Sequence, residues 1–323
     1  MIFDGHSDIF TDVTARRLKG ETQVLKNHHL PRLREAKMEG AFFVLWIDPP
    51  HDANPQKRLG ELLQCAKDEM AECEEAVLVK SYKEIEEAKK AGKFYIMAGA
   101  EGLSGIGKDL SKIDELYDFG VREVMLTWNE QNDLASGAKG DPDAGLTALG
   151  KQAVKLIQDK CMLMDVSHTN ERTCWDIAKI NNGPLIASHS NARALVNVPR
   201  NLTDCQLLEI RDTNGMVGLN SFNEFVSSVP AEQTVDGLIR HADYIANKIG
   251  VEHLAFGFDF CEFLDSEAAG AFSSQENTYT IGLEDATKVP YMVEKMRAAG
   301  FTDKDLEMIC RANWLNLIKR TIG

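Results

Sequence analysis

Short apolar segments recur along the chain, and each of them ends in polar or charged residues. They lie at residues 2–8, 41–48, 94–101, 123–129, 162–168, 185–189, 216–220 and 254–259. Most are nearly continuous in apolar or small residues, which is typical of parallel strands that are covered on both faces. The pattern therefore predicts eight buried strands.

Amphipathic segments lie between these strands. Apolar residues repeat at helical spacing over residues 149–157 and 238–249, and the second stretch stops at Gly250, a residue suited to the position after a helix. Thr203 and Gln206 have the spacing of a capping box, so a helix is expected to begin there. Strand and helix therefore alternate along the chain.

This alternation, with no Pro/Gly/Ser-rich linker to divide it, favours an α/β fold made of a single (β/α)8 TIM barrel. We expect residues 1–323 to form one barrel domain with elaborated loops at its C-terminal mouth. The longest stretches without a predicted strand, 49–92 and 260–282, are expected to be such loops. The Gly, Ala and Ser residues of 260–282 are compatible with a lid over a substrate, which the sequence leaves open.

Composition narrows the range of partners. Fifty Asp and Glu residues against 36 Lys and Arg residues give a formal net charge of −14, so we expect neither a nucleic-acid partner nor a membrane partner. The apolar runs fall short of the roughly 18 residues of a membrane span. The seven cysteines are scattered without a Cys-x-x-Cys pair, and the start MIFDGHSDIF does not resemble a signal peptide. These features predict a reduced, cytoplasmic protein.

Candidate chemistry lies where the predicted strands end, because functional side chains of such barrels project from the C-terminal ends of the strands. His6 and Asp8 close the first segment and point the same way, since side chains alternate along a strand. Later segments are closed by Glu101, His168, His189 and Asp259. Imidazoles and carboxylates at one point suit divalent cations such as Zn²⁺, and one Glu can bridge two cations. A single strand-end His is more often structural, but three on one rim favour a metal site.

Several longer motifs, in order along the chain, resemble the membrane (renal) dipeptidase family, a metal-dependent peptidase branch of the amidohydrolase-like barrels. The resemblance covers nearly the whole chain. It rests on DGHSDIF, AGAEG, GLTALGKQAVKLIQDKCMLMDVSH, SHSNARALVNVPRNLTD, GFDF and IGLEDATKVPYMVEKMRAAGFTDKDLEMICRANWLNLIKR. Their order, at the expected strand ends, makes the resemblance more specific than any one motif.

The resemblance implies a binuclear metal site. His6 and Asp8 would hold one divalent metal ion, and His168 and His189 would hold the second. Glu101 would bridge the pair. Zn²⁺ is the expected metal in both positions.

The resemblance also implies two substrate-binding residues. Arg200, eleven residues after His189, would grip the substrate carboxylate, for which its planar guanidinium is suited. Arg193 is the competing candidate. Asp259 would pair with the substrate α-amine and assist proton transfer to the leaving group.

Two departures from the family pattern lie near the mouth. Where the mammalian members carry a His after strand four, this chain has Trp128 and Asn129, either of which would take over that substrate contact. An indole N–H can donate a hydrogen bond but cannot exchange a proton near neutral pH. Asp259 is followed by Phe-Cys-Glu instead of Asp-Gly, so the shape of the pocket is expected to differ.

The leading hypothesis is a dinuclear metallopeptidase that hydrolyses dipeptides, with L- and D-residues both open at the C-terminal position. An alternative substrate class is N-acyl amino acids, lactams or lactones, for which Trp128 is the motivating departure. The alternative that is not an enzyme is a catalytically silent barrel that binds a ligand or a partner. Because members of the family often pair, a homodimer is a further expectation of the resemblance.

Overall fold

The strands form one parallel sheet that curls into a nearly closed barrel. The computed structural model describes residues 1–264, 268 and 277–323. Its strands are β1 (Ile2–Asp4), β2 (Met38–Trp46), β3 (Ala76–Leu78), β4 (Phe94–Glu101), β5 (Val121–Met125), β6 (Leu163–Asp165), β7 (Leu185–Ala187), β8 (Met216–Leu219) and β9 (Leu254–Phe256). They follow the order β1-β2-β4-β5-β6-β7-β8-β9, with β3 paired to β4 beside this path. The Gly5 N–H donates to the Phe256 carbonyl at 2.9 Å and links the two ends of the sheet.

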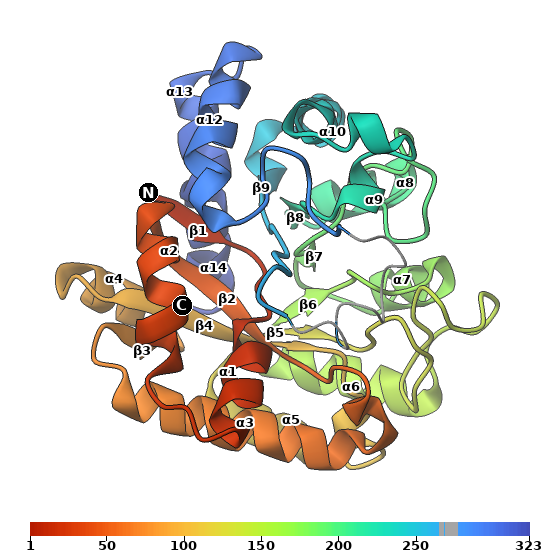
Figure 1. The fold of residues 1–323 in the computed structure, drawn as a ribbon. Helices are drawn as coiled ribbons and strands as arrows, with labels where there is room; N and C mark the ends of the chain where they lie inside the picture. Colours follow the sequence, from red (N-terminus) through yellow and green to blue (C-terminus); the bar gives the residue numbers. More distant parts are fainter. Residues whose placement is uncertain (265–267, 269–276) are drawn as a thin grey trace.

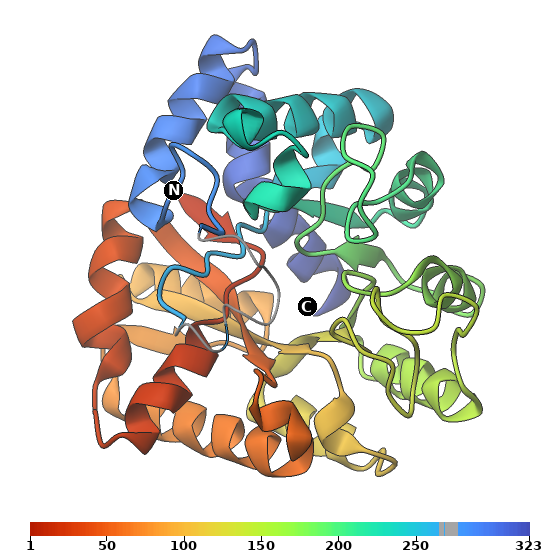
Figure 2. The same ribbon diagram turned by 45° about the vertical axis from the view of Figure 1, so that its right-hand side comes forward.

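Helices cover the outside of the barrel (Figures 1 and 2). They are α1 (Ile9–Leu18), α2 (Leu30–Glu35), α3 (Pro55–Glu72), α4 (Tyr82–Lys90), α5 (Lys112–Phe119), α6 (Ala148–Asp159), α7 (Glu171–Ala178), α8 (Asp204–Asp212), α9 (Asn223–Val226), α10 (Val235–Ile249), α12 (Val289–Ala298), α13 (Asp303–Glu307) and α14 (Asn313–Thr321). Each of the eight predicted segments overlaps one barrel strand, so the predicted (β/α)8 fold is confirmed.

Local sequence signals set the ends of several helices. The Thr203 hydroxyl accepts from Gln206 N while the Gln206 side chain accepts from Thr203 N, which is the predicted capping box at the start of α8. The helix α10 ends at Gly250, whose φ of +93° is unfavourable for residues with a Cβ. These local predictions are confirmed.

Apolar side chains fill the interior of the barrel, and α14 covers one end of it. Trp314 is fully buried, and its Nε1 donates to the Phe256 carbonyl at 2.8 Å. A Cβ at Gly5 would lie 2.5 Å from the Trp314 ring, so only glycine leaves room for this side chain. The indole packs edge-on to Phe42 of β2 with ring centroids 5.8 Å apart. Because α14 closes the interior from one end, the polar ends of the strands are left at the other.

One prediction about the loops is wrong. Residues 49–92 do not form an elaboration of the mouth, because they contain α3, β3 and α4. β3 pairs with the beginning of β4, where Ala76 lies opposite Phe94. Three residues are too short a strand to stand out in the hydrophobic pattern. The proposed lid at 260–282 falls largely on residues 265–267 and 269–276, which lie outside the described residues.

Within the described part of the chain, helices that combine the length and the apolar character needed to cross a bilayer are absent. All seven cysteines are free thiols.

Candidate metal centre and substrate pocket

The five predicted metal-binding residues converge at the C-terminal mouth of the barrel. His6 and Asp8 follow β1, Glu101 is the last residue of β4, and the other two histidines follow β6 and β7. All five side chains are buried, from 0% exposed for His6 and His189 to 6% for His168. The parallel strands thus bring together residues that are far apart in the sequence.

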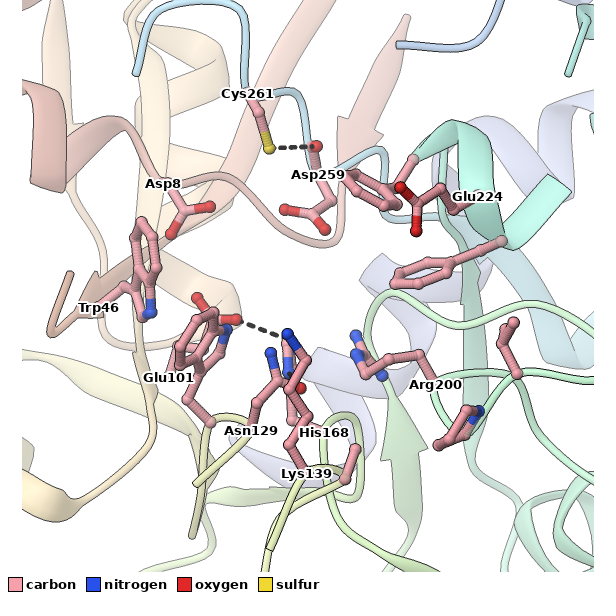
Figure 3. A pocket seen from close by; sticks show the side chains of 16 residues that line it. Asp8, Trp46, Glu101, Asn129, Lys139, His168, Arg200, Glu224, Asp259 and Cys261 are labelled. Carbon is pink, nitrogen blue, oxygen red and sulfur yellow. Dashed lines mark hydrogen bonds and ion pairs between the residues drawn. The ribbon is translucent and has the colours of Figure 1, made fainter. Parts of the chain in front are cut away.

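Glu101 lies close to all three of these histidines. Its Oε1 is 2.8 Å from His168 Nε2, a contact drawn in Figure 3. The same oxygen is 3.8 Å from His189 Nε2. Its other oxygen, Oε2, is 3.5 Å from His6 Nε2. The two oxygens of one carboxylate therefore face different imidazoles, which is the arrangement that a bridging ligand requires.

Several atoms of this cluster have no hydrogen-bond partner among the described residues. They are both ring nitrogens of His6, Asp8 Oδ1 and Glu101 Oε2. A buried polar atom without a partner costs about 1–3 kcal/mol. Ligand atoms of His6, Glu101 and His189 lie within 4.8 Å of one another, as do those of His6, Asp8 and Asp259. The donor set and its unpaired atoms fit divalent cations.

Burial shifts the pKa of several groups in this cluster. Desolvation, followed by the charge of Arg200, lowers the pKa of His168 well below its usual range. Desolvation, followed by His6, does the same to the pKa of His189. Both imidazoles are therefore neutral near pH 7, the form that binds metals. Desolvation raises the pKa of Glu101 and of Asp8 well above the usual values, so a cation at this place would stabilise their ionised forms.

Neighbouring side chains orient the second pair of imidazoles. Asn129 Oδ1 lies 3.0 Å from His168 Nδ1, so this nitrogen carries the hydrogen and Nε2 keeps its lone pair. Ser188 Oγ lies 2.8 Å from His189 Nδ1. Asn129 was predicted to bind substrate; its amide oxygen is bonded to His168 and the residue also lines the pocket, so this role stays a prediction. Trp128 lines the pocket, with its ring centroid 5.3 Å from that of Trp46.

Arg200 is buried at one side of the mouth (Figure 3). Its guanidinium donates to the His189 carbonyl at 3.2 Å and to Ser190 Oγ at 3.4 Å, and its Nε has no partner among the described residues. Burial lowers the pKa of Arg200 to about 10, which leaves it charged at neutral pH. Ion pairs with a carboxylate are absent for Arg200 within the described residues, so its charge is available to an anionic group of a substrate.

The competing candidate, Arg193, is committed to structural contacts. It donates to the carbonyls of Asn201 and Pro199, each at 2.8 Å, and pairs with Glu171. It is also absent from the lining of the pocket. The geometry therefore favours Arg200 as the anion-binding residue.

Asp259 lines the same pocket as Arg200. Its Oδ1 is 3.8 Å from His6 Nε2, and its Oδ2 accepts from Asn220 Nδ2 at 3.0 Å. Asp259 has a φ of +58° and His168 a φ of +65°, both in the left-handed region that non-glycine residues rarely adopt. Such backbone strain concentrates at functional sites.

A cavity of about 210 Å³ connects these groups (Figure 3). Its charged and polar lining includes Asp8, Glu101 and His168 of the proposed metal-binding set, as well as Arg200 and Asp259. It also includes Lys139 and Glu224, which sequence reasoning missed. The apolar lining comprises Trp46, Trp128, Ala138, Val198, Pro199, Phe222 and Phe225. Trp46 ends β2, so its strand-end position could have identified it. Lys139 and Glu224 lie outside the predicted segments and gave no such signal.

Comparison with known proteins agrees with this geometry. Residues 1–322 match the family described as membrane dipeptidase, peptidase family M19. An uncharacterized protein of Klebsiella pneumoniae is 36% identical over 230 residues, which cover 68% of this chain and 79% of that protein.

Two solved structures are similar over the whole fold. The dipeptidase AC, a metallopeptidase of family M19, is 26% identical with a TM-score of 0.87, covering 100% of this chain and 98% of its own. A metallopeptidase of Rhodobacter sphaeroides, solved with a phosphinate mimic of the dipeptide L-Ala-D-Ala, is 25% identical with a TM-score of 0.85 and 99% of both chains covered.

Proposed function

Because the chain belongs to the membrane dipeptidase family, peptidase family M19, and is a metallo-dipeptidase, we propose that it works with two divalent cations, expected to be Zn²⁺. His6 and Asp8 would hold one ion, and His168 and His189 the other. Glu101 would bridge them. The observation that carries this proposal is the Glu101 carboxylate, whose two oxygens face different histidines at 2.8 Å and 3.5 Å.

Bound cations of this kind supply an activated water near neutral pH and polarise the scissile carbonyl. The protein's own residues would bind the two ends of the substrate. Arg200 would bind the substrate carboxylate through its guanidinium, whose Nε–H has no partner among the described residues. Asp259 would pair with the α-amine through Oδ1, while Asn220 fixes Oδ2. When the peptide C–N bond breaks, the departing amine needs a proton, which Asp259 would accept from the attacking water and pass on.

A positive and a negative group in the lining of one cavity of about 210 Å³ favour a short substrate with both termini free. A longer peptide would have to bury uncharged peptide groups against Arg200 or Asp259. Dipeptides with a D-residue at the C-terminal position belong to the proposed range, since the similar Rhodobacter sphaeroides protein binds a mimic of L-Ala-D-Ala.

The alternative substrate class remains worth testing because Trp128 presents an apolar wall to the pocket. An N-acyl amino acid keeps the carboxylate for Arg200 but lacks the amine for Asp259. Its hydrolysis would therefore depend on the apolar wall and not on Asp259.

The decisive experiment is elemental analysis of the purified protein, followed by a panel of L,L- and L,D-dipeptides, tripeptides and N-acetylated amino acids. We expect two equivalents of metal and turnover of dipeptides alone. Preferred turnover of the acetylated compounds would favour the alternative class. Two bound metals without turnover of any amide would support a silent binding barrel instead.

Two further properties belong to the proposal. We propose that residues 1–323 form one domain, which predicts a single cooperative unfolding transition. We also propose a homodimer, which light scattering coupled to size-exclusion chromatography would detect as twice the chain mass of 35.9 kDa. A monomer mass would contradict the second proposal.

A further inference from the structure

Asp165 is a buried carboxylate directly below the metal-binding histidines. It is the last residue of β6 and is 0% exposed. Its Oδ1 accepts from Ser167 N at 2.7 Å. The Ser188 N–H donates to Oδ1 at 3.3 Å and to Oδ2 at 3.2 Å. One side chain therefore ties together the segments that follow β6 and β7.

These two segments carry His168 and His189. Ser167 directly precedes His168, whose left-handed backbone must be held against its own strain. Ser188 directly precedes His189, and its Oγ contacts His189 Nδ1 at 2.8 Å. The His189 N–H also donates to Ser167 Oγ at 3.4 Å. Asp165 thus holds the backbone of the residue that directly precedes each of the two histidines.

Glu123 is another buried carboxyl group inside the barrel, and both of its oxygens lack a hydrogen-bond partner among the described residues. It lies on β5, next to β6, and is 0% exposed. A Cβ on Gly99 of β4 would lie 2.0 Å from Glu123 Oε2, so glycine at this position makes room for the carboxyl group. Burial and the charge of Asp165 raise the pKa of Glu123 well above its usual value. Glu123 is therefore a neutral acid whose O–H can donate to Asp165.

We propose that Asp165 is a positioning residue that fixes the geometry of His168 and His189 through the backbone N–H groups of Ser167 and Ser188. This inference rests on the proposed binuclear metal site, because it concerns the orientation of two of its ligands. Asp165 is not among the residues that line the cavity, so its effect would pass entirely through the histidines.

A second carboxylate in the barrel is arranged in the same way. Asp4, at the end of β1, accepts from His6 N at 3.3 Å and from Phe258 N at 2.9 Å. His6 is a proposed ligand, and Phe258 directly precedes Asp259. Asp4 and Asp165 thus share one arrangement. Each is a buried Asp at a strand end that accepts from the backbone N–H two residues later. Each also accepts from a backbone N–H in the segment that follows a neighbouring strand. This recurrence supports positioning of the ligands as the role of Asp165.

The test compares Asp165→Asn with Glu69→Gln. Glu69 is also 0% exposed and accepts from Leu25 N at 2.8 Å, but it lies on the outer helix α3. Each protein is depleted of metal and titrated with Co²⁺, whose visible absorption reports the ligand geometry. Asp165→Asn is expected to weaken metal binding by about 10- to 100-fold, to alter the Co²⁺ spectrum and to lower kcat with little change in KM. Glu69→Gln is expected to lower only the melting temperature.

Two more variants keep the test independent of folding yield. Glu123→Gln retains an N–H donor toward Asp165 and is expected to bind Co²⁺ like the wild type. Ser188→Ala removes only the hydroxyl beside His189 and is expected to weaken metal binding several-fold. Unchanged Co²⁺ affinity and spectrum in Asp165→Asn, or in Asp165→Glu should Asp165→Asn not fold, would overturn the inference. A wild type that binds no metal or cleaves no dipeptide would instead refute the proposed function.

Discussion

The Nε2 atoms of His168 and His189 lie 2.8 Å apart in the buried mouth of the barrel. The Nδ1 hydrogen of His168 is directed to Asn129, so its Nε2 presents a lone pair toward the other ring. Two neutral imidazoles in this arrangement are stabilised by a cation that accepts both lone pairs. This relationship makes metal binding the property on which activity and stability are both expected to depend.

Glu101→Gln should remove most of the activity. The amide keeps the shape of the side chain but replaces one bridging oxygen with an N–H group, which repels a cation. Because changes even outside the ligand set commonly cost about 10- to 100-fold, a loss of at least about 100-fold in kcat/KM is expected. Elemental analysis should show less metal per chain. Full activity with an unchanged metal content would contradict the bridging role.

Removal of the metals should destabilise the folded protein as well as inactivate it. A ligand at 1,000 times its Kd stabilises the native state by about 4 kcal/mol, so chelation should lower the melting temperature measurably. Calorimetry with and without a chelator, followed by addition of Zn²⁺, Mn²⁺ or Co²⁺, measures the effect. Restored stability together with restored turnover is expected. Full turnover in a metal-free sample would contradict the metal-dependent mechanism.

The convergence of the candidate metal ligands could be predicted from the sequence because strand ends are visible in the hydrophobic pattern. His6, Glu101 and His189 each close or directly follow an apolar run, and the topology of a parallel barrel brings such ends to one rim. The parallel topology therefore predicts where the candidate site lies without knowledge of any tertiary contact.

Contacts that depend on loop packing were not predictable. Asn129 and His168 are 39 positions apart, and their hydrogen bond depends on how the loop after β5 folds back over β6. The positive φ of His168 arises from tertiary contacts and leaves no mark in the composition. The strand β3 was missed because Ala76–Leu78 is too short to show a period.

Arg200→Met should mainly raise KM. Methionine fills a similar volume but removes the buried charge, and a hydrogen bond to a charged group contributes about 1.5–3 kcal/mol. An increase in KM of roughly 10- to 100-fold with a smaller change in kcat is expected. Arg193→Met is the matched control, since its guanidinium bonds Pro199 and Asn201 and does not line the pocket. Equal effects of the two substitutions would contradict the assignment.

The protein should lose stability in mild acid through His241. Burial lowers the pKa of this histidine from 6.5 to about 4, with a smaller contribution from Arg240. The unfolded chain therefore binds the proton more readily, and stability falls as the pH drops from 6.5 toward 4. Between pH 7 and pH 5 the loss is about 2 kcal/mol.

The variant His241→Asn tests this pH dependence. Its amide oxygen can still accept from Ala192 N, which bonds His241 Nδ1 at 3.1 Å, but it does not titrate. Urea unfolding at both pH values should give a flatter dependence for the variant than for the wild type. Other buried groups such as His29 contribute equally to both proteins and cancel in the difference. Identical slopes would exclude His241 as a source of the acid sensitivity.

Asn129→Ala separates a role in metal binding from a role in substrate binding. The amide oxygen of Asn129 bonds His168 Nδ1 at 3.0 Å, so its removal frees the imidazole to rotate or to change tautomer. Loss of such a partner typically weakens metal binding or activity by about 10- to 100-fold. We therefore expect a lower kcat, a weaker metal affinity and nearly unchanged KM. Asn129 also lines the cavity, so a substrate contact would instead raise KM and leave the metal affinity intact. Kinetics at saturating metal, paired with a metal titration of the same variant, distinguishes the two roles.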